Sequence, residues 1–358
     1  RGFERVPVQP RPSAQQPHPA WPENSDTERD NDTAATCADW LRQEHAQPFL
    51  AVADLNNPHN ICGWVGEHDS MQGPVTNTPP PGELPALPAN FHVEDLAARP
   101  LPVQYICCTH NRLGQAARWT EENYRHYVAA YCHYTELADA KVGMIMDALA
   151  DGGHLDNTVV IVTADHGDGM ASHGMVTKQV SMYDEVMRVP FIIAGPDIPQ
   201  AETAVTALTS QLDLLPTLLD VAGLDAPPAL RGRSVMPLVT GREHVLHPYV
   251  AGEWHTEWGF TISPGRMIRT PRHKYIRYLE GDGEELYDMH EDPGETRNLA
   301  GDPACAGILT DLRAMLAAHL RNTGDDFEGL RVAVDTRWRS HPTGYGHHQG
   351  PTAPMAGS

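Results

Sequence analysis

The fold is decided by the stretch Thr158-Val159-Val160-Ile161-Val162-Thr163-Ala164-Asp165-His166-Gly167-Asp168, in which an apolar run ends in polar residues. Its β-branched side chains predict a strand over 158–163. The apolar run 48–55, closed by Asn56-Asn57-Pro58, predicts a second strand buried on both faces. Between the two runs, apolar residues recur at three- and four-residue steps over 121–149. This spacing predicts a long helix, with Thr120 as its N-cap.

The order strand, long helix, strand indicates an α/β fold, because a right-handed crossover through the helix makes the two strands parallel. A third strand is predicted over 189–194, with Pro190 at its start. A helix is predicted over 212–222, with Gly223 as its C-terminal cap. We therefore expect a largely parallel central sheet flanked by helices.

Composition predicts the domain organisation along the rest of the chain. Residues 1–35 are rich in Pro, Gln, Asn and Asp and predict an irregular segment before an α/β domain over 36–240. Short alternating runs predict a small antiparallel α+β subdomain over 241–338, which includes a helix over 308–320. Residues 339–358 predict a disordered tail.

Charge and length limit the classes of function. The 358 residues include 26 Lys and Arg against 47 Asp and Glu, a net charge of −21. This charge repels nucleic-acid phosphates and anionic membrane surfaces, so a nucleic-acid partner is not expected. No stretch approaches the ~18 consecutive apolar residues of a membrane-spanning helix, so no transmembrane segment is predicted. The sequence decides neither the oligomeric state nor the localisation, which is periplasmic, secreted or cytoplasmic.

Polar residues follow two of the predicted strands at the points where these strands end. In an open parallel sheet, ligands bind outside the carboxyl ends of the strands. Asp165 and His166 together offer one oxygen and one nitrogen ligand for a metal ion, or alternatively form a capped turn beside a surface histidine. His59 is either aimed into the crevice by Pro58 or is a solvated loop residue.

Two further candidates lie in the loop after Asp168. Lys178 is either an anion-binding residue or a solvated surface charge. His173 is a partner of the site residues, a substrate contact or an ordinary loop residue. The proline-rich residues 71–102 predict a long loop, and loops of this kind often border a binding site.

Taken in order, these segments resemble the sulfatases of the alkaline phosphatase superfamily. The resemblance covers residues 48 to about 300 and rests on motifs that occur in the family's order. The first are the stretch quoted at the start, Pro48 through His59, and Asp139 four residues before Gly143. The others are Lys178 with Tyr183-Asp184-Glu185-Val186-Met187-Arg188-Val189-Pro190, Leu212-Asp213-Leu214-Leu215-Pro216-Thr217, Glu285-Leu286-Tyr287-Asp288, Asp292-Pro293-Gly294-Glu295 and Asn298-Leu299. It implies an alkaline phosphatase-like fold and a sulfuric ester hydrolase that releases inorganic sulfate from an aryl or carbohydrate sulfate ester.

The resemblance also implies roles for four residues. Asp165 and His166 stand at the positions of two metal ligands, which implies one divalent ion, calcium first, with manganese and magnesium as alternatives. Lys178 matches the lysine that contacts the substrate sulfate, and His59 matches the histidine that binds sulfate and protonates the leaving oxygen. Both would be catalytic and substrate-binding, with His173 as another substrate-binding candidate. A metal ion and cationic side chains neutralise the sulfate oxygens during in-line attack.

The motif of the family's nucleophile is missing. That nucleophile is a formylglycine made from Cys or Ser in a C/S-x-P-x-R motif, and no Cys or Ser of this chain begins one. We therefore expect a fragment of a sulfatase, inactive alone, with the formylglycine in an N-terminal part that the 358 residues do not include. Two alternatives stay open: a phosphonate or phosphate ester hydrolase of the same superfamily, and a non-catalytic sulfate-binding module.

Overall fold

The computed structural model describes residues 25–67, 83–92, 99–100, 102–103, 119–178, 182–199, 204–254, 264–279 and 283–330. The chain divides into two compact units. The first comprises residues 1–87 and 118–158, and the second comprises residues 88–117 and 159–358.

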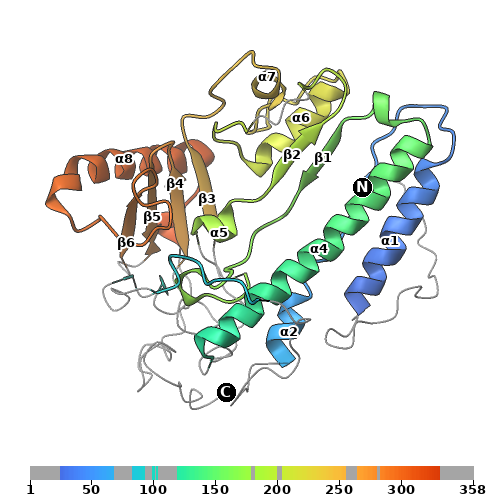
Figure 1. The fold of residues 1–358 in the computed structure, drawn as a ribbon. Helices are drawn as coiled ribbons and strands as arrows, with labels where there is room; N and C mark the ends of the chain where they lie inside the picture. Colours follow the sequence, from blue (N-terminus) through green and yellow to red (C-terminus); the bar gives the residue numbers. More distant parts are fainter. Residues whose placement is uncertain are drawn as a thin grey trace. The chain divides into compact units, whose positions relative to one another are not determined.

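The helices of the first unit, among its described residues, are connected by irregular segments. Helices α1 (Ser25–Leu41) and α4 (Glu121–Asp151) lie side by side, and the short α2 (Ile61–Glu67) also contacts α4 (Figure 1). The long helix predicted over 121–149 is confirmed. Its start is fixed by a capping box, in which the Thr120 hydroxyl accepts the Asn123 N–H and the Asn123 side chain accepts the Thr120 N–H.

Helix α1 lies partly in the segment 1–35, which was predicted to be irregular. That prediction is wrong for residues 25–35. Asp30, Ala34, Ala38 and Leu41 recur at three- and four-residue steps, and all four are buried. They form a narrow helix face that packs on α4. The prediction missed this face because two of its four members are alanines within a polar stretch.

The prediction of a strand over 48–55 is also wrong. These residues are not assigned to a strand, and the side chains of Leu50 and Val52 are 50% and 71% exposed. A strand requires a neighbour that pairs with its backbone N–H and C=O groups. The described part of the first unit contains no strand that could pair with this run.

The second unit contains the two other predicted strands as β1 (Val160–Thr163) and β2 (Phe191–Ala194). They pair antiparallel, with Val160 opposite Ala194 and Thr163 opposite Phe191. No parallel pair occurs among the strands of the described ranges. The sequence pattern therefore located these two strands, while the expected parallel pairing through the crossover helix was not found.

One short helix lies between β1 and β2 in the sequence, and two more follow β2. They are α5 (Asp184–Met187), α6 (Leu214–Val221) and α7 (Met236–Val239), and a 3₁₀ turn, Gln211–Asp213, precedes α6. The helix predicted over 212–222 is confirmed as α6. Gly223 follows it with φ of +68°, a left-handed conformation that suits glycine.

The C-terminal part contains a four-stranded antiparallel sheet, as the alternating runs predicted. Strands β3 (Val250–Trp254), β4 (Gly265–Arg269), β5 (His273–Tyr278) and β6 (Glu284–Asp288) pair in sequence order. Helix α8 (Ala306–Thr323) packs against β4 and β5 (Figure 1). Their shared core includes Ile268, Tyr275, Leu286, Leu309, Leu312 and Leu316.

The tail predicted over 339–358 lies outside the described residues. Every helix within the described ranges is too short or too polar to cross a lipid bilayer.

Candidate functional site

Asp165 and His166 form an exposed turn directly after β1. Their side chains are 86% and 41% exposed, and His166 Nε2 lies 3.5 Å from Asp165 Oδ2. His166 Nδ1 lies 2.8 Å from the carbonyl oxygen of Gly167, which requires a proton on Nδ1. Nε2 of the neutral ring then carries a lone pair beside a carboxylate oxygen. This donor set fits two ligands of one divalent cation, because ligands at about 2.1–2.5 Å from a metal stand about 3–3.5 Å apart.

The described residues supply this pair of metal ligands but no cluster of three. No group of three or more His, Cys, Asp or Glu side chains within the described ranges is arranged to hold a metal ion.

The side chain of Gln211, which lies 46 residues after Asp165, holds the backbone of this turn by hydrogen bonds. Its Nε2 donates to the carbonyl oxygens of Ala164, at 2.5 Å, and of Asp165, at 2.8 Å. Gln211 has no signal in the sequence, because the contact spans 46 residues and a glutamine before a helix has no distinctive pattern.

Gly167 connects the turn to the backbone of the segment that contains α5. Its N–H donates to the carbonyl oxygen of Val186 at 2.8 Å. A Cβ at position 167 would stand 1.9 Å from the carbonyl oxygen of Glu185, so only glycine permits this approach. The segment that contains α5 therefore supports the candidate metal ligands.

Lys178 stands at the end of a loop that folds back on the same motif. The Gly169 N–H donates to Thr177 O at 3.0 Å, and the Ala171 N–H donates to Met175 O at 3.1 Å. Lys178 directly follows Thr177 and is half-buried. The structure thus places Asp165, His166 and Lys178 in one loop system of the second unit.

His173 lies in the same loop but is only 1% exposed. Its N–H donates to Asn90 O at 2.8 Å, and its ring stacks on Tyr183 with 4.2 Å between centroids. Burial, followed by the positive charge of Arg99, lowers the pKa of His173 to about 3. The ring is therefore neutral and fixed at neutral pH.

His59 belongs to the first unit, where it is exposed in a turn before α2. The buried Asp30 of α1 holds this turn, because its carboxylate accepts the N–H groups of Asn56, at 2.6 Å, and Asn57, at 2.9 Å. Asp30 was not predicted as a functional residue, because it lies in the stretch that was predicted to be irregular.

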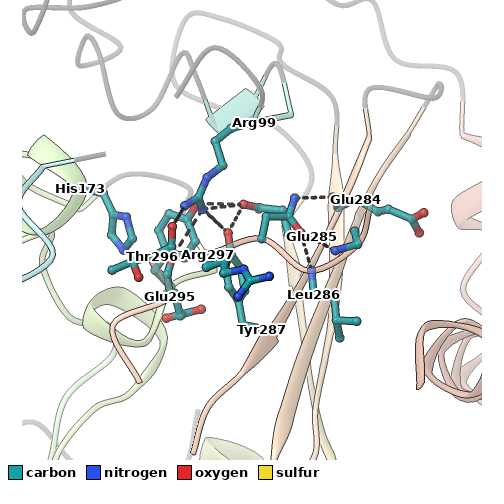
Figure 2. A network of polar contacts seen from close by, with 12 residues as sticks. Arg99, His173, Glu284, Glu285, Leu286, Tyr287, Glu295, Thr296 and Arg297 are labelled. Atoms are coloured by element: carbon teal, nitrogen blue, oxygen red, sulfur yellow. Dashed lines mark hydrogen bonds and ion pairs between the residues drawn. The ribbon is translucent and has the colours of Figure 1, made fainter. Parts of the chain in front are cut away.

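A buried polar network joins the proline-rich loop to the C-terminal sheet. Figure 2 shows the guanidinium of Arg99 between the backbone of Glu295 and Thr296 and the side chains of Glu285 and Tyr287. Arg99 Nη1 lies 3.6 Å from Glu285 Oε1, and both side chains are at most 1% exposed. The charge of Arg99 is therefore compensated inside the protein.

Three tyrosines complete the hydrogen bonding of Glu285. Tyr183, Tyr278 and Tyr287 donate to its carboxylate at 2.9, 2.8 and 2.5 Å. Burial and the Glu285 charge hold the pKa of Tyr287 well above its ordinary value, so its hydroxyl stays a donor.

A second buried group fixes the start of α5. Lys274 Nζ lies 2.5 Å from Asp184 Oδ1 and 2.8 Å from Glu295 Oε1, and its side chain is fully buried. Glu295 Oε2 also accepts the Asp184 N–H at 2.7 Å. Burial raises the pKa of Glu295 to about 7, although the charge of Lys274 opposes the shift. Through the contact of Lys274 with Asp184, the C-terminal sheet supports the α5 segment that contacts Gly167.

Comparison with known proteins gives matches over most of the chain. The model of the family described as sulfatase matches residues 1–224, and that of the N-sulphoglucosamine sulphohydrolase C-terminal domain matches residues 171–322. A Delta 4,5-hexuronate-2-O-sulfatase of Bacteroides thetaiotaomicron is 49% identical over 338 residues, which are 94% of this chain and 70% of that protein. Arylsulfatase K of Xenopus laevis is 31% identical over 290 residues, 75% of this chain and 51% of that protein.

A solved structure described as a 2-O GAG sulfatase superposes with a TM-score of 0.89 at 48% identity. The match covers 99% of this chain and 75% of that one.

Proposed function

The chain belongs to the sulfatase family, and from this premise we propose that the protein removes the 2-O-sulfate group of a hexuronate in a sulfated carbohydrate. Membership confirms the resemblance drawn from the sequence motifs and the assignment to the sulfuric ester hydrolases. The substrate proposal depends on the 49% identity to the Delta 4,5-hexuronate-2-O-sulfatase over nearly the whole chain.

The substrate class is tested by measuring sulfate release with the protein that the complete coding sequence encodes. An unsaturated hexuronate disaccharide with a 2-O-sulfate is compared with a 6-O-sulfated glucosamine and an aryl sulfate, by ion chromatography of the sulfate released. We expect about tenfold or greater preference for the hexuronate in kcat/KM. Equal or faster hydrolysis of the other two esters would overturn the proposal.

Asp165 and His166 are proposed as two ligands of one divalent metal ion. Members of the family use a divalent metal and a formylglycine. Calcium is our first choice of ion, with manganese or magnesium as alternatives. Asp165 offers the hard oxygen that calcium and magnesium prefer, whereas the nitrogen of His166 favours a softer ion such as manganese. When bound, the ion would neutralise charge on the sulfate oxygens.

Lys178 and His59 are proposed as the catalytic and sulfate-binding side chains. The ammonium of Lys178 offers three N–H donors and a positive charge to the sulfate oxygens. The imidazole of His59 would give a proton to the leaving alcohol oxygen. His173 is proposed to act by holding Tyr183 in place, because its ring is buried and neutral.

Three further parts of the sequence interpretation belong to this proposal. The 358 residues contain no C/S-x-P-x-R motif, so we propose that residues outside them supply the nucleophile. The largely parallel central sheet and the domain boundaries at residues 240 and 338 also remain predictions.

A further inference from the structure

We propose that Gln211 is a positioning residue, whose side-chain amide fixes the direction in which Asp165 and His166 present their ligand atoms. The inference rests on the proposed role of this pair in metal binding. Gln211 lies outside the motif and is not itself arranged as a ligand, since its amide nitrogen is committed to two backbone oxygens.

The two carbonyl groups that Gln211 holds belong to consecutive peptide planes. The Ala164 carbonyl lies in the plane before the Asp165 Cα, and the Asp165 carbonyl lies in the plane after it. A peptide unit is planar, so only φ and ψ at Asp165 relate the two planes. Hydrogen bonds from one amide to both oxygens therefore restrict both dihedral angles of Asp165.

A third hydrogen bond extends the same restriction to His166. The Gly167 N–H lies in the next peptide plane and donates to Val186 O at 2.8 Å. With the planes on both sides of its Cα held, His166 also has fixed φ and ψ. Val186 contributes its backbone, and Asp165 Oδ1 accepts the His166 N–H at 2.9 Å, so substitution of Gln211 alters the arrangement without changing either proposed ligand.

The backbone around Gln211 is itself fixed by hydrogen bonds to the side chain of Asp213. The side chain of Asp213 is fully buried and accepts the N–H groups of Ser210 and Arg233, at 2.8 Å each, and His247 Nε2 at 2.9 Å. A Cβ on Gly232 would stand 1.9 Å from Leu212 O, so the backbone of the turn is closely packed. The amide of Gln211 therefore reaches the Asp165 turn from a fixed position.

The chemistry requires an amide and not merely a side chain of this size. A glutamine NH₂ group has two protons, one for each carbonyl oxygen. The carboxylate of a glutamate has only acceptor oxygens and would face two carbonyl oxygens, while a leucine has no donor. The substitutions Gln211→Glu and Gln211→Leu should both release the turn without a large change in volume.

The experiment is nitrogen-15 NMR of histidine side chains in the 358-residue chain, with Mn²⁺ alone as the probe. The His166 signal is assigned by its loss in His166→Asn. In the unsubstituted chain we expect the Nδ1–H tautomer and selective broadening of His166 by Mn²⁺.

In Q211L and Q211E we expect averaged tautomers and about tenfold more Mn²⁺ for the same broadening. The melting temperature without metal should change little, because the bonds are exposed.

Gln43→Leu is the matched control. Gln43 is also an exposed glutamine whose Nε2 donates to a backbone carbonyl, that of Asp39, at 3.2 Å. It should leave the His166 spectrum unchanged. An unchanged His166 tautomer and Mn²⁺ response in Q211L and Q211E would overturn the inference. If Mn²⁺ fails to broaden His166 in the unsubstituted chain, the proposed metal role fails, and the tautomer comparison still decides whether Gln211 positions the turn.

Discussion

Two buried ionisable residues near the candidate site have pKa values shifted in opposite directions for one physical reason. Burial disfavours the charged form, which lowers the pKa of His173 to about 3 and raises that of Glu295 to about 7. Neutral His173 can stack on Tyr183 without an unpaired charge. Glu295 shares the cation Lys274 with Asp184, and its burial opposes a negative charge on its carboxyl group.

The raised pKa of Glu295 predicts how stability depends on pH. The folded chain binds this proton more tightly than the unfolded chain, whose pKa is near 4.5. The contribution of Glu295 to stability is therefore present below about pH 4.5 and is lost as the pH rises to about 7. The ceiling of this loss is about 3 kcal/mol, reduced by the coupling to Lys274. Glu295→Gln should remove this contribution. The stability at pH 8 relative to pH 5, measured by urea unfolding, should therefore be higher in the variant than in the unsubstituted chain.

Glu291→Gln is the control for this measurement. Glu291 is 70% exposed, so its removal should leave the pH dependence as it is in the unsubstituted chain. If Glu295→Gln keeps the same difference between the two pH values, the titration belongs to another group.

At the scale of single residues, the sequence revealed the groups that could bear chemistry but not the residues that hold them. Asp165, His166 and Lys178 were found because they follow a strand and match a motif. Gln211, Arg99 and Lys274 were not found, because their partners are distant in the sequence: Lys274 and Asp184 are 90 residues apart. Such contacts arise only when the chain has folded, and no local pattern contains them.

At the scale of elements, Gly167 joins the turn after β1 to the segment of α5. A Cβ there would stand 1.9 Å from Glu185 O, which is backbone and cannot rotate away. Gly167→Ala should therefore separate the two segments, with a loss of about 2–4 kcal/mol in the free energy of unfolding. It should also weaken the Mn²⁺ response of His166. Urea unfolding and the same NMR titration measure both effects.

Gly143→Ala provides the comparison for Gly167→Ala. Gly143 lies inside α4, and a Cβ there would meet no atom within 4 Å. Alanine is the better helix former by about 1 kcal/mol, so this variant should be as stable as the unsubstituted chain or more stable. Destabilisation of similar size in both variants would contradict the steric argument.

The elements that the sequence predicted well are those with a complete local pattern. Helix α4 has a cap and a regular apolar face, and β5 and β6 are short runs bounded by turn-forming residues. The run 48–55 shows the limit of this reasoning. Its apolar residues predict a buried strand, but pairing depends on a neighbour that the run itself does not specify, and the described residues provide none.

At the scale of the whole molecule, the second unit exposes several large apolar side chains despite the net charge of −21. On β2 and near α6, Ile192, Leu212, Leu215 and Leu224 are 50–61% exposed. Within the described residues, β1 and β2 each pair only with the other, so each has an unpaired edge. Exposed apolar surface and open edges favour association, while the negative charge opposes it.

We therefore expect the chain to self-associate and to do so more strongly as salt screens the charge. Sedimentation velocity at low and high salt measures this. The combined variant Ile192→Thr, Leu212→Gln and Leu224→Gln should associate less. Met144→Gln, which removes a 40% exposed side chain of α4, serves as the control. A monomer at both salt concentrations would contradict the prediction.

The whole chain should also fail to turn over a sulfate ester by itself. In the proposed site, Lys178 and a metal ion on the Asp165–His166 pair would attract and orient a sulfate group. Attack on sulfur also needs a nucleophile, and no C/S-x-P-x-R motif occurs in the 358 residues. With p-nitrophenyl sulfate and either Ca²⁺ or Mn²⁺, we expect the same nitrophenol release as from Lys178→Ala. Release above that of the variant would show that a residue of this chain acts as the nucleophile, because a contaminating sulfatase would be equally active in both preparations.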